Sequence, residues 1–187
     1  MRELVFLSVA GVLCLSSAGV AKQPSAVDRG RYLVTIMGCN DCHTQTVPGP
    51  GGAPVPDTTR LLSGHPQGVP HPTWSPADME QRHSAGLAGP MLTVWAGPWG
   101  VSFASNLTPD QETGIGEWSE KAFIQMMRTG KHQGQPNGRD VLPPMPWRWY
   151  RQATDADLKA IWAYLRSLPP VKNQVPSPLP PGANAQQ

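Results

Sequence analysis

The feature that most constrains this chain is the run Cys39-Asn40-Asp41-Cys42-His43. Two thiols three positions apart, followed at once by an imidazole, form the pattern of covalent c-type haem attachment. On one turn of chain the thiols can reach two vinyl groups of neighbouring pyrroles, and His43 can then present Nε2 to the iron. We therefore expect one covalent haem c with its iron, and helices packed around it.

Three other interpretations use the same residues. A thioredoxin-like redox pair needs a βαβ context, which the sequence does not offer. A tetrahedral zinc site needs a second pair of ligands at matching spacing, and no further cysteine follows Cys42. An incidental Cys-x-x-Cys-His run is the third interpretation. It fits poorly with an exported chain that has no other cysteines after its leader.

The N-terminus is typical of a targeting segment. Met1-Arg2 is followed by an apolar stretch over residues 4–15 and by small residues over 16–21. This order predicts a signal peptide over residues 1–21, cleaved after Ala21 or Ala18, with retention as a membrane anchor as the alternative. Cys14 would leave with it. The expected location is the periplasm, free or at the outer side of the inner membrane.

Hydrophobic periodicity predicts three helices, over residues 28–38, 119–129 and 154–168. Ser119 and Thr154 are the expected N-caps of the second and third helices. The chain of 187 residues also holds 22 Pro and 19 Gly, which predicts long irregular loops between the helices. We see no convincing strand, and only Pro76–Ala85 favours a further helical turn between residues 47 and 100. The expected fold is a single mainly α domain over residues 26–170, with a Pro-rich flexible tail over 171–187.

Met145 is the expected sixth iron ligand. It lies in Leu142-Pro143-Pro144-Met145-Pro146-Trp147, where the flanking prolines hold the thioether on a stiff segment with no helix or strand to pack from. Other methionines, on helix faces or in loops, fit a role as core fillers. The alternative ligands are the remaining histidines, His65, His71, His83 and His132. Of these, His65 and His71 lie in Gly-His-Pro and Pro-His-Pro runs and are interpreted mainly as surface-loop residues, although one of them could replace Met145.

Further side chains are expected around the haem. A carbonyl of the turn Pro48-Gly49-Pro50 is the predicted partner of the His43 Nδ1–H. Hydrogen bonds to the haem propionates are expected from Arg139, Trp147 and Arg148. The tryptophans expected to cover the flat apolar face of the haem are Trp95, Trp99, Trp118, Trp147 and Trp149.

The sequence resembles the class I cytochromes c over most of the mature chain. The first predicted helix ends in Gly38-Cys39, and the last contains Asp157–Leu165. More narrowly, three segments are similar to cytochrome subunits of bacterial membrane-associated dehydrogenases: Ser105–Asp110, Thr113–Trp118 and Pro144–Trp147.

Those dehydrogenase subunits commonly carry three haem domains and serve alcohol, gluconate or aldehyde oxidation. The chain resembles one such domain alone. The resemblance implies that Cys39 and Cys42 bind haem, that His43 and Met145 are its axial ligands, and that Asn106 and Trp118 line or brace the pocket. Residues 50–100 exceed the usual length of the pattern and are a candidate partner surface.

The expected function is one-electron transfer rather than catalysis. Iron with two strong axial ligands has no open position for a substrate, so electrons would arrive from a periplasmic dehydrogenase and leave to an oxidase or another cytochrome. A haem enzyme of the peroxidase kind and a small-ligand sensor are the alternatives, and both need a displaceable sixth ligand. A net charge of +2 with scattered basic residues argues against nucleic acid as a partner.

Overall fold

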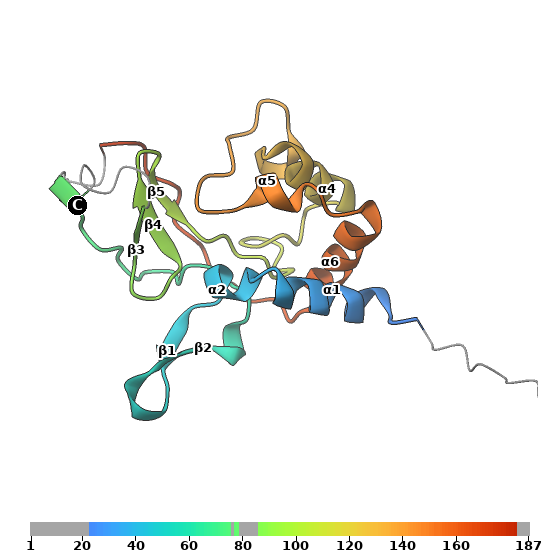
Figure 1. Cartoon of the computed structure of the whole chain (residues 1–187), viewed down its shortest axis with the longest axis horizontal. Coiled ribbons are helices and arrows are strands. Elements are labelled where there is room, and N and C mark those ends of the chain that lie inside the picture. The colour runs from blue at the N-terminus through green and yellow to red at the C-terminus, as the bar shows by residue number, and fades with distance from the viewer. Residues whose placement is uncertain (1–22, 76, 79–85, 183–187) are drawn as a thin grey trace, which may run out of the picture.

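The computed structural model describes residues 23–75, 77–78 and 86–182. The predicted signal peptide therefore lies outside the described residues, as do His83 and most of the Pro76–Ala85 stretch. Figure 1 shows α4 (Glu120–Thr129), α5 (Trp147–Tyr150) and α6 (Asp155–Ser167) on one side of the molecule and a small sheet on the other. In this view α1 (Ala26–Ile36) runs beneath those helices, and α2 (Cys39–His43) continues it towards the sheet. No helix among the described residues has the length and apolar character needed to cross a membrane.

Among the described residues, the long α-helices confirm the three predicted from periodicity, and two short ones, α2 and α5, join them. Each long helix begins where a hydroxyl side chain accepts a hydrogen bond from a backbone N–H three residues on, at Ser25, Ser119 and Thr154. This cap satisfies a donor that the first helical turn leaves free. The cap at Ser25 starts the first helix two residues before the predicted position. The helices are α1 (Ala26–Ile36), α2 (Cys39–His43), α4 (Glu120–Thr129), α5 (Trp147–Tyr150) and α6 (Asp155–Ser167).

The crossing of α1 over α6 forms the centre of the main core. Leu33 and Val34 of α1 pack with Leu158, Ile161 and Leu165 of α6, all of them buried. Gly30 permits this approach, because a Cβ built there would lie 1.9 Å from the carbonyl oxygen of Ala160. The first and last helices are thus held against each other at backbone distance.

Gly30→Ala should lower the free energy of unfolding by about 3 kcal/mol or more, because the new methyl group forces the two backbones apart. This loss outweighs the roughly 1 kcal/mol by which Ala is the better helix former. Urea denaturation followed by circular dichroism measures the change. Ile36→Ala, at a residue of α1 that is 59% exposed, is the matched control and should have little effect. Equal stabilities for the two variants would contradict the close crossing.

The expectation that the chain contains no strand is wrong. A hairpin pairs β1 (Thr46–Pro48) with β2 (Pro54–Pro56), and a three-stranded antiparallel sheet has the order β3 (Leu87–Ala88), β4 (Val94–Gly97), β5 (Gly100–Phe103). In the sheet Trp95 pairs with Ser102, and Ala96 with both Leu87 and Val101. These strands hold two to four residues each, too few for alternation to stand out in a Gly- and Pro-rich stretch.

The segment after α6 is packed rather than flexible over its described part, residues 171–182. Asn173 is fully buried, and Leu179 exchanges two backbone hydrogen bonds of 3.0 Å with Val101 of β5. Leu179 also packs against a second core cluster formed by Trp74, Val94, Ala96 and Val101. The sequence predicts a flexible tail over residues 171–187 because this segment is rich in proline and polar residues and lacks the apolar periodicity of a helix or a strand. Its order comes from contacts with distant parts of the chain.

Candidate cofactor site

The single turn α2 presents Cys39, Cys42 and His43. It begins at Gly38, whose left-handed φ of 66° ends α1 and turns the chain into α2. The C-terminal end of α2 is held by two hydrogen bonds from the backbone of residues 62–64. The Gly64 N–H donates to the His43 carbonyl at 2.8 Å, and the Leu62 N–H donates to the buried Thr44 hydroxyl at 2.9 Å. The attachment motif is therefore held in place at both ends.

Both thiols are free and half-buried. Burial, reinforced by the neighbouring Cys42, raises the pKa of Cys39 to about 11, and burial likewise raises the pKa of Cys42. Reactive pairs of the thioredoxin kind need a lowered thiol pKa. The surroundings of this pair therefore argue against a thiol–disulfide catalyst. Among the described residues, no three His, Cys, Asp or Glu side chains come together as a metal cluster.

The His43 ring is set as a ligand to a metal. Its Nδ1 lies 2.8 Å from the Ser105 carbonyl oxygen. Because a carbonyl only accepts, Nδ1 carries the proton and Nε2 keeps its lone pair. Burial lowers the pKa of His43, and the hydrogen bond to Ser105 opposes part of this effect. The lowered pKa favours the neutral ring. The predicted partner in the Pro48–Pro50 turn is wrong, since the orienting carbonyl comes from the segment after β5.

A cavity of about 470 Å³ adjoins the motif. Its walls come from α1, α2, α4, α5 and α6, strands β4 and β5, and the segments that follow β5, α4 and α6, with apolar side chains of α1, α4 and α6 among them. The six residues expected from the sequence to form the site all line it: Cys39, Cys42, His43, Asn106, Trp118 and Met145.

Met145 reaches the cavity from the segment Leu142–Met145, all of which lines it. A side-chain contact holds this segment directly: the Ser102 hydroxyl of β5 donates to the Pro143 carbonyl at 2.6 Å and accepts from the Trp99 indole N–H at 3.2 Å. Five residues after Met145, the Tyr150 hydroxyl of α5 donates to the Met37 carbonyl, just past the end of α1. Met145 thus sits on a segment tied to the sheet, and the helix that follows this segment is tied to the end of α1.

Other thioethers also face the cavity. Met126 and Met127 line it from α4 and Met37 from the turn between α1 and α2, and Met127 is buried in the main core cluster. These positions fit the expected role as apolar wall. Met145 differs from Met126 and Met127 because it belongs to neither a helix nor a strand, and from Met37 because prolines flank it on both sides.

The described histidines fall into three environments. His65, expected in a surface loop, is 1% exposed, and both ring nitrogens have partners, the Thr93 hydroxyl at 2.9 Å and the Val69 carbonyl at 3.1 Å. His71 stacks on Trp74. Neither lines the cavity. His132 does, and its ring meets Trp118 edge to face at 5.2 Å. His132 is therefore the described histidine best placed to compete with Met145.

The expected haem-covering tryptophans separate into two groups. Trp95 and Trp118 line the cavity, whereas Trp99, Trp147 and Trp149 do not. Trp147 instead packs on Gly130, and Trp149 is 77% exposed. Of the side chains expected near the propionates, Arg139 lines the cavity, and Trp147 and Arg148 lie outside its wall.

Asn106 braces the wall behind the cavity. Its amide oxygen accepts from the Thr108 N–H and hydroxyl at 3.0 and 2.8 Å, and its amide nitrogen donates to the Val171 carbonyl at 2.8 Å. This side chain is 3% exposed, so its polar atoms depend on these partners. Through Val171, Asn106 holds the start of the segment that follows α6.

Several residues of the site were missed by the sequence analysis. Ser105 acts through a backbone carbonyl and Ser102 through a hydroxyl in a short strand, so neither leaves a signal in the sequence. Residues 174–178 form another part of the wall, from a segment expected to be flexible.

Known proteins with similar sequences belong to bacterial dehydrogenases. The gluconate 2-dehydrogenase cytochrome c subunit of Pantoea cypripedii is 28% identical over 165 residues, 88% of this chain and 28% of the relative. The fructose dehydrogenase cytochrome subunit of Gluconobacter japonicus is 28% identical over 155 residues, 78% of this chain and 29% of the relative. This chain is a homologue of dehydrogenase cytochrome c subunits. A nicotinate dehydrogenase component of Pseudomonas putida is 36% identical over 119 residues, 56% of this chain and 10% of the relative.

This cytochrome homologue spans less than a third of the length of each of these relatives. No family model matches it. The homology implies haem c with its iron, and the residues of the cavity fit that group. Two free thiols and a neutral histidine with an open Nε2 lie together on α2, at the edge of an apolar cavity with a thioether at Met145.

Proposed function

We propose that this chain is a periplasmic mono-haem c-type cytochrome that transfers single electrons from a dehydrogenase to a downstream oxidase or another cytochrome. The observation that carries the proposal is the convergence of Cys39, Cys42, His43 and Met145 on one largely apolar cavity. The names of the relatives support a dehydrogenase as the donor. The single haem rests on the one Cys-x-x-Cys-His run, and export rests on residues 1–21.

In this proposal Cys39 and Cys42 attach the haem through thioethers, and His43 and Met145 are its axial ligands. Haem c supplies a one-electron iron couple, whose potential a histidine–methionine pair raises. The Ser105 carbonyl fixes the His43 ring and keeps its proton on Nδ1. The Ser102 hydroxyl keeps the Met145 segment from moving away.

The apolar wall keeps water from the cofactor and limits how much the surroundings rearrange when the charge on the iron changes. Phe123, Ile161 and Leu165 line the cavity from α4 and α6, and each is at most 4% exposed. Burial of the haem away from solvent is one way in which a protein raises the reduction potential of the iron. The same packing that holds the fold together thus serves the electron carrier.

The partner meets this chain in a small and transient contact. Electron-transfer encounters bury less surface than stable complexes do. A net charge of +2 gives no strong field of one sign, which suits a carrier that binds a donor and an acceptor in turn.

A reduced-minus-oxidised visible spectrum of protein matured with haem tests the proposal. We expect a c-type α band, one haem per chain by pyridine haemochrome, and the weak long-wavelength band of ferric haem bound by methionine. A c-type spectrum without that band would favour His132 or water as sixth ligand and reopen the enzyme and sensor alternatives. Rapid binding of carbon monoxide by the reduced protein would support those alternatives. The absence of covalent haem would contradict the whole proposal.

A further inference from the structure

The segment after α6 forms one wall of the cavity. Five successive residues line it: Gln174, Val175, Pro176, Ser177 and Pro178. Three of them, Gln174, Pro176 and Ser177, are also exposed to solvent. A single layer of extended chain therefore separates the cavity from water at this wall. We call residues 174–178 the strap.

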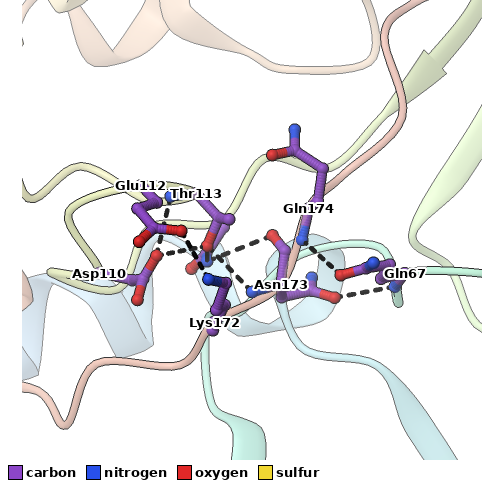
Figure 2. A network of polar contacts seen from close by, with 8 residues as sticks. Gln67, Asp110, Glu112, Thr113, Lys172, Asn173 and Gln174 are labelled. Carbon is purple, nitrogen blue, oxygen red and sulfur yellow. Dashed lines mark hydrogen bonds and ion pairs between the residues drawn. The ribbon is translucent and has the colours of Figure 1, made fainter.

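The strap is held at its first end by Asn173. Its amide nitrogen donates to the carbonyls of Ser63 and His65 at 2.6 and 2.9 Å, and its amide oxygen accepts from the Gln67 N–H at 2.8 Å. The Asn173 backbone N–H donates to the Thr113 hydroxyl at 2.9 Å. Figure 2 shows Asn173 between Gln67 on one side and the Asp110–Thr113 loop on the other.

The other end of the strap is held by Leu179. Its two backbone hydrogen bonds with Val101 add a short bridge to the edge of β5. Figure 1 shows this last stretch of chain, drawn in red, running from α6 to the sheet. The strap is therefore fixed at two points, one on the loops beside α2 and one on the sheet.

Between these points the strap has few ties. Two hydrogen bonds involve its described residues, the Gln174 N–H to the Gln67 amide oxygen at 3.2 Å and the Gln174 amide to the Val175 carbonyl at 3.4 Å. Pro176 and Pro178 have no N–H to donate. The position of the strap thus depends on its two ends and on the stiffness of the prolines.

We propose that Asn173 is a positioning residue that holds the strap closed over the cavity and so keeps water and small ligands from the cofactor. The buried amide of Asn173 makes three hydrogen bonds, two through its N–H groups and one through its oxygen, so replacing it leaves two carbonyls and one N–H without these partners. Such groups regain partners only if the segment opens to water. The statement about the cofactor rests on the proposed function. The closure of the strap does not.

Asn173→Ala is the direct test, read by hydrogen exchange and by ligand entry. We expect the backbone amide of Gln174, whose N–H donates to the Gln67 side chain at 3.2 Å, to exchange about tenfold faster or more, the scale of one lost hydrogen bond. Imidazole should bind the ferric holoprotein about tenfold faster, and the midpoint potential should fall as water enters. Lys172→Gln is the matched control, because Lys172 neighbours Asn173 but makes an exposed ion pair of 2.6 Å with Glu112.

A second variant covers the case in which Asn173→Ala fails to fold. Pro176→Gly with Pro178→Gly leaves both ends of the strap intact and only loosens the chain between them. It should accelerate exchange at the Gln174 backbone amide and speed imidazole entry in the same direction. Lys172→Gln should match the parent protein in every measurement.

The two proposals fail in different ways. If the parent protein carries c-type haem but both strap variants exchange and bind imidazole like Lys172→Gln, the strap proposal is overturned and the electron carrier stands. If the parent protein carries no haem, the electron carrier is overturned. Exchange at the Gln174 backbone amide of the apoprotein then still decides whether Asn173 holds the strap.

Discussion

A Cys39→Ala, Cys42→Ala variant should lose all covalently bound haem. Without either thiol no thioether forms, so a denaturing gel stained for haem peroxidase activity should show no band, whereas the parent protein should show one at the position of the chain. The effect is all or none because the described chain has no other thiol: Cys39 and Cys42 are its free cysteines. This variant has the largest effect that we expect.

The two single variants serve as its controls. Each keeps one thiol on α2 and should retain haem through one thioether, with the α band shifted to longer wavelength by the remaining vinyl group. A haem-stained band that persists in the double variant would contradict attachment at α2. Loss of the protein from both single variants would instead indicate a folding defect.

Met145→Ala should remove the sixth iron ligand while leaving the haem attached. We expect loss of the long-wavelength ferric band, a partly high-spin ferric spectrum and faster binding of imidazole. The midpoint potential should fall by on the order of 100 mV, a modest part of the roughly 0.8 V that axial ligation spans in haem proteins. Equilibrium redox titration with a spectroelectrochemical cell measures the change.

Met126→Ala is the matched control for this prediction. Met126 also lines the cavity with a thioether, but from the face of α4. Removing a wall methionine should lower stability by about 2–3 kcal/mol and leave the ferric band in place. If Met126→Ala abolishes the band and Met145→Ala does not, the ligand has been assigned to the wrong residue.

The helices and the attachment motif are the parts of this fold that the sequence predicts well. Their signals are local: a cap at Ser119 or Thr154, a stripe of apolar residues three and four apart, a glycine at a helix end. The Ser119 and Thr154 caps are where the pattern predicts them, and α4 ends as expected at Thr129, where Gly130 takes a left-handed φ of 68°. Such local features are satisfied by neighbours along the chain, so a sequence window contains all their partners.

The sheet and the ordered C-terminal segment depend on partners far away in sequence. Asn173 meets Ser63 across 110 positions, and the His43 ring meets Ser105 across 62. Nothing around Asn173 distinguishes it from the asparagine of a loose tail. The same holds for His65, which sits in a Gly-His-Pro run typical of a surface loop and is fully buried. Burial is decided by what packs on a segment, which a window of sequence does not contain.

The residues of the candidate site also separate into those with a local sequence signal and those whose role depends on distant partners. Cys39, Cys42 and His43 are recognisable because haem attachment demands fixed spacing, and Met145 because prolines enclose it. The residues that orient the cysteines, the histidine and the methionine need no fixed spacing or flanking sequence, so no motif marks them. A backbone carbonyl at Ser105 or a hydroxyl at Ser102 does its work through position alone.

The origin of the cavity walls imposes an order on assembly. Cys39 and Cys42 lie early in the chain, whereas the Leu142–Met145 segment and residues 174–178 come late. A chain made from its N-terminus therefore exposes both thiols before the last two walls exist. In the proposed cytochrome, haem attached in that interval would be enclosed when the C-terminal segment docks. In the complete fold the thiols are half-buried, and burial raises the pKa of Cys39 to about 11, which makes its thiolate scarce. The proposal therefore implies that haem attachment precedes the final folding step, because a chain that folds first encloses thiols of low reactivity.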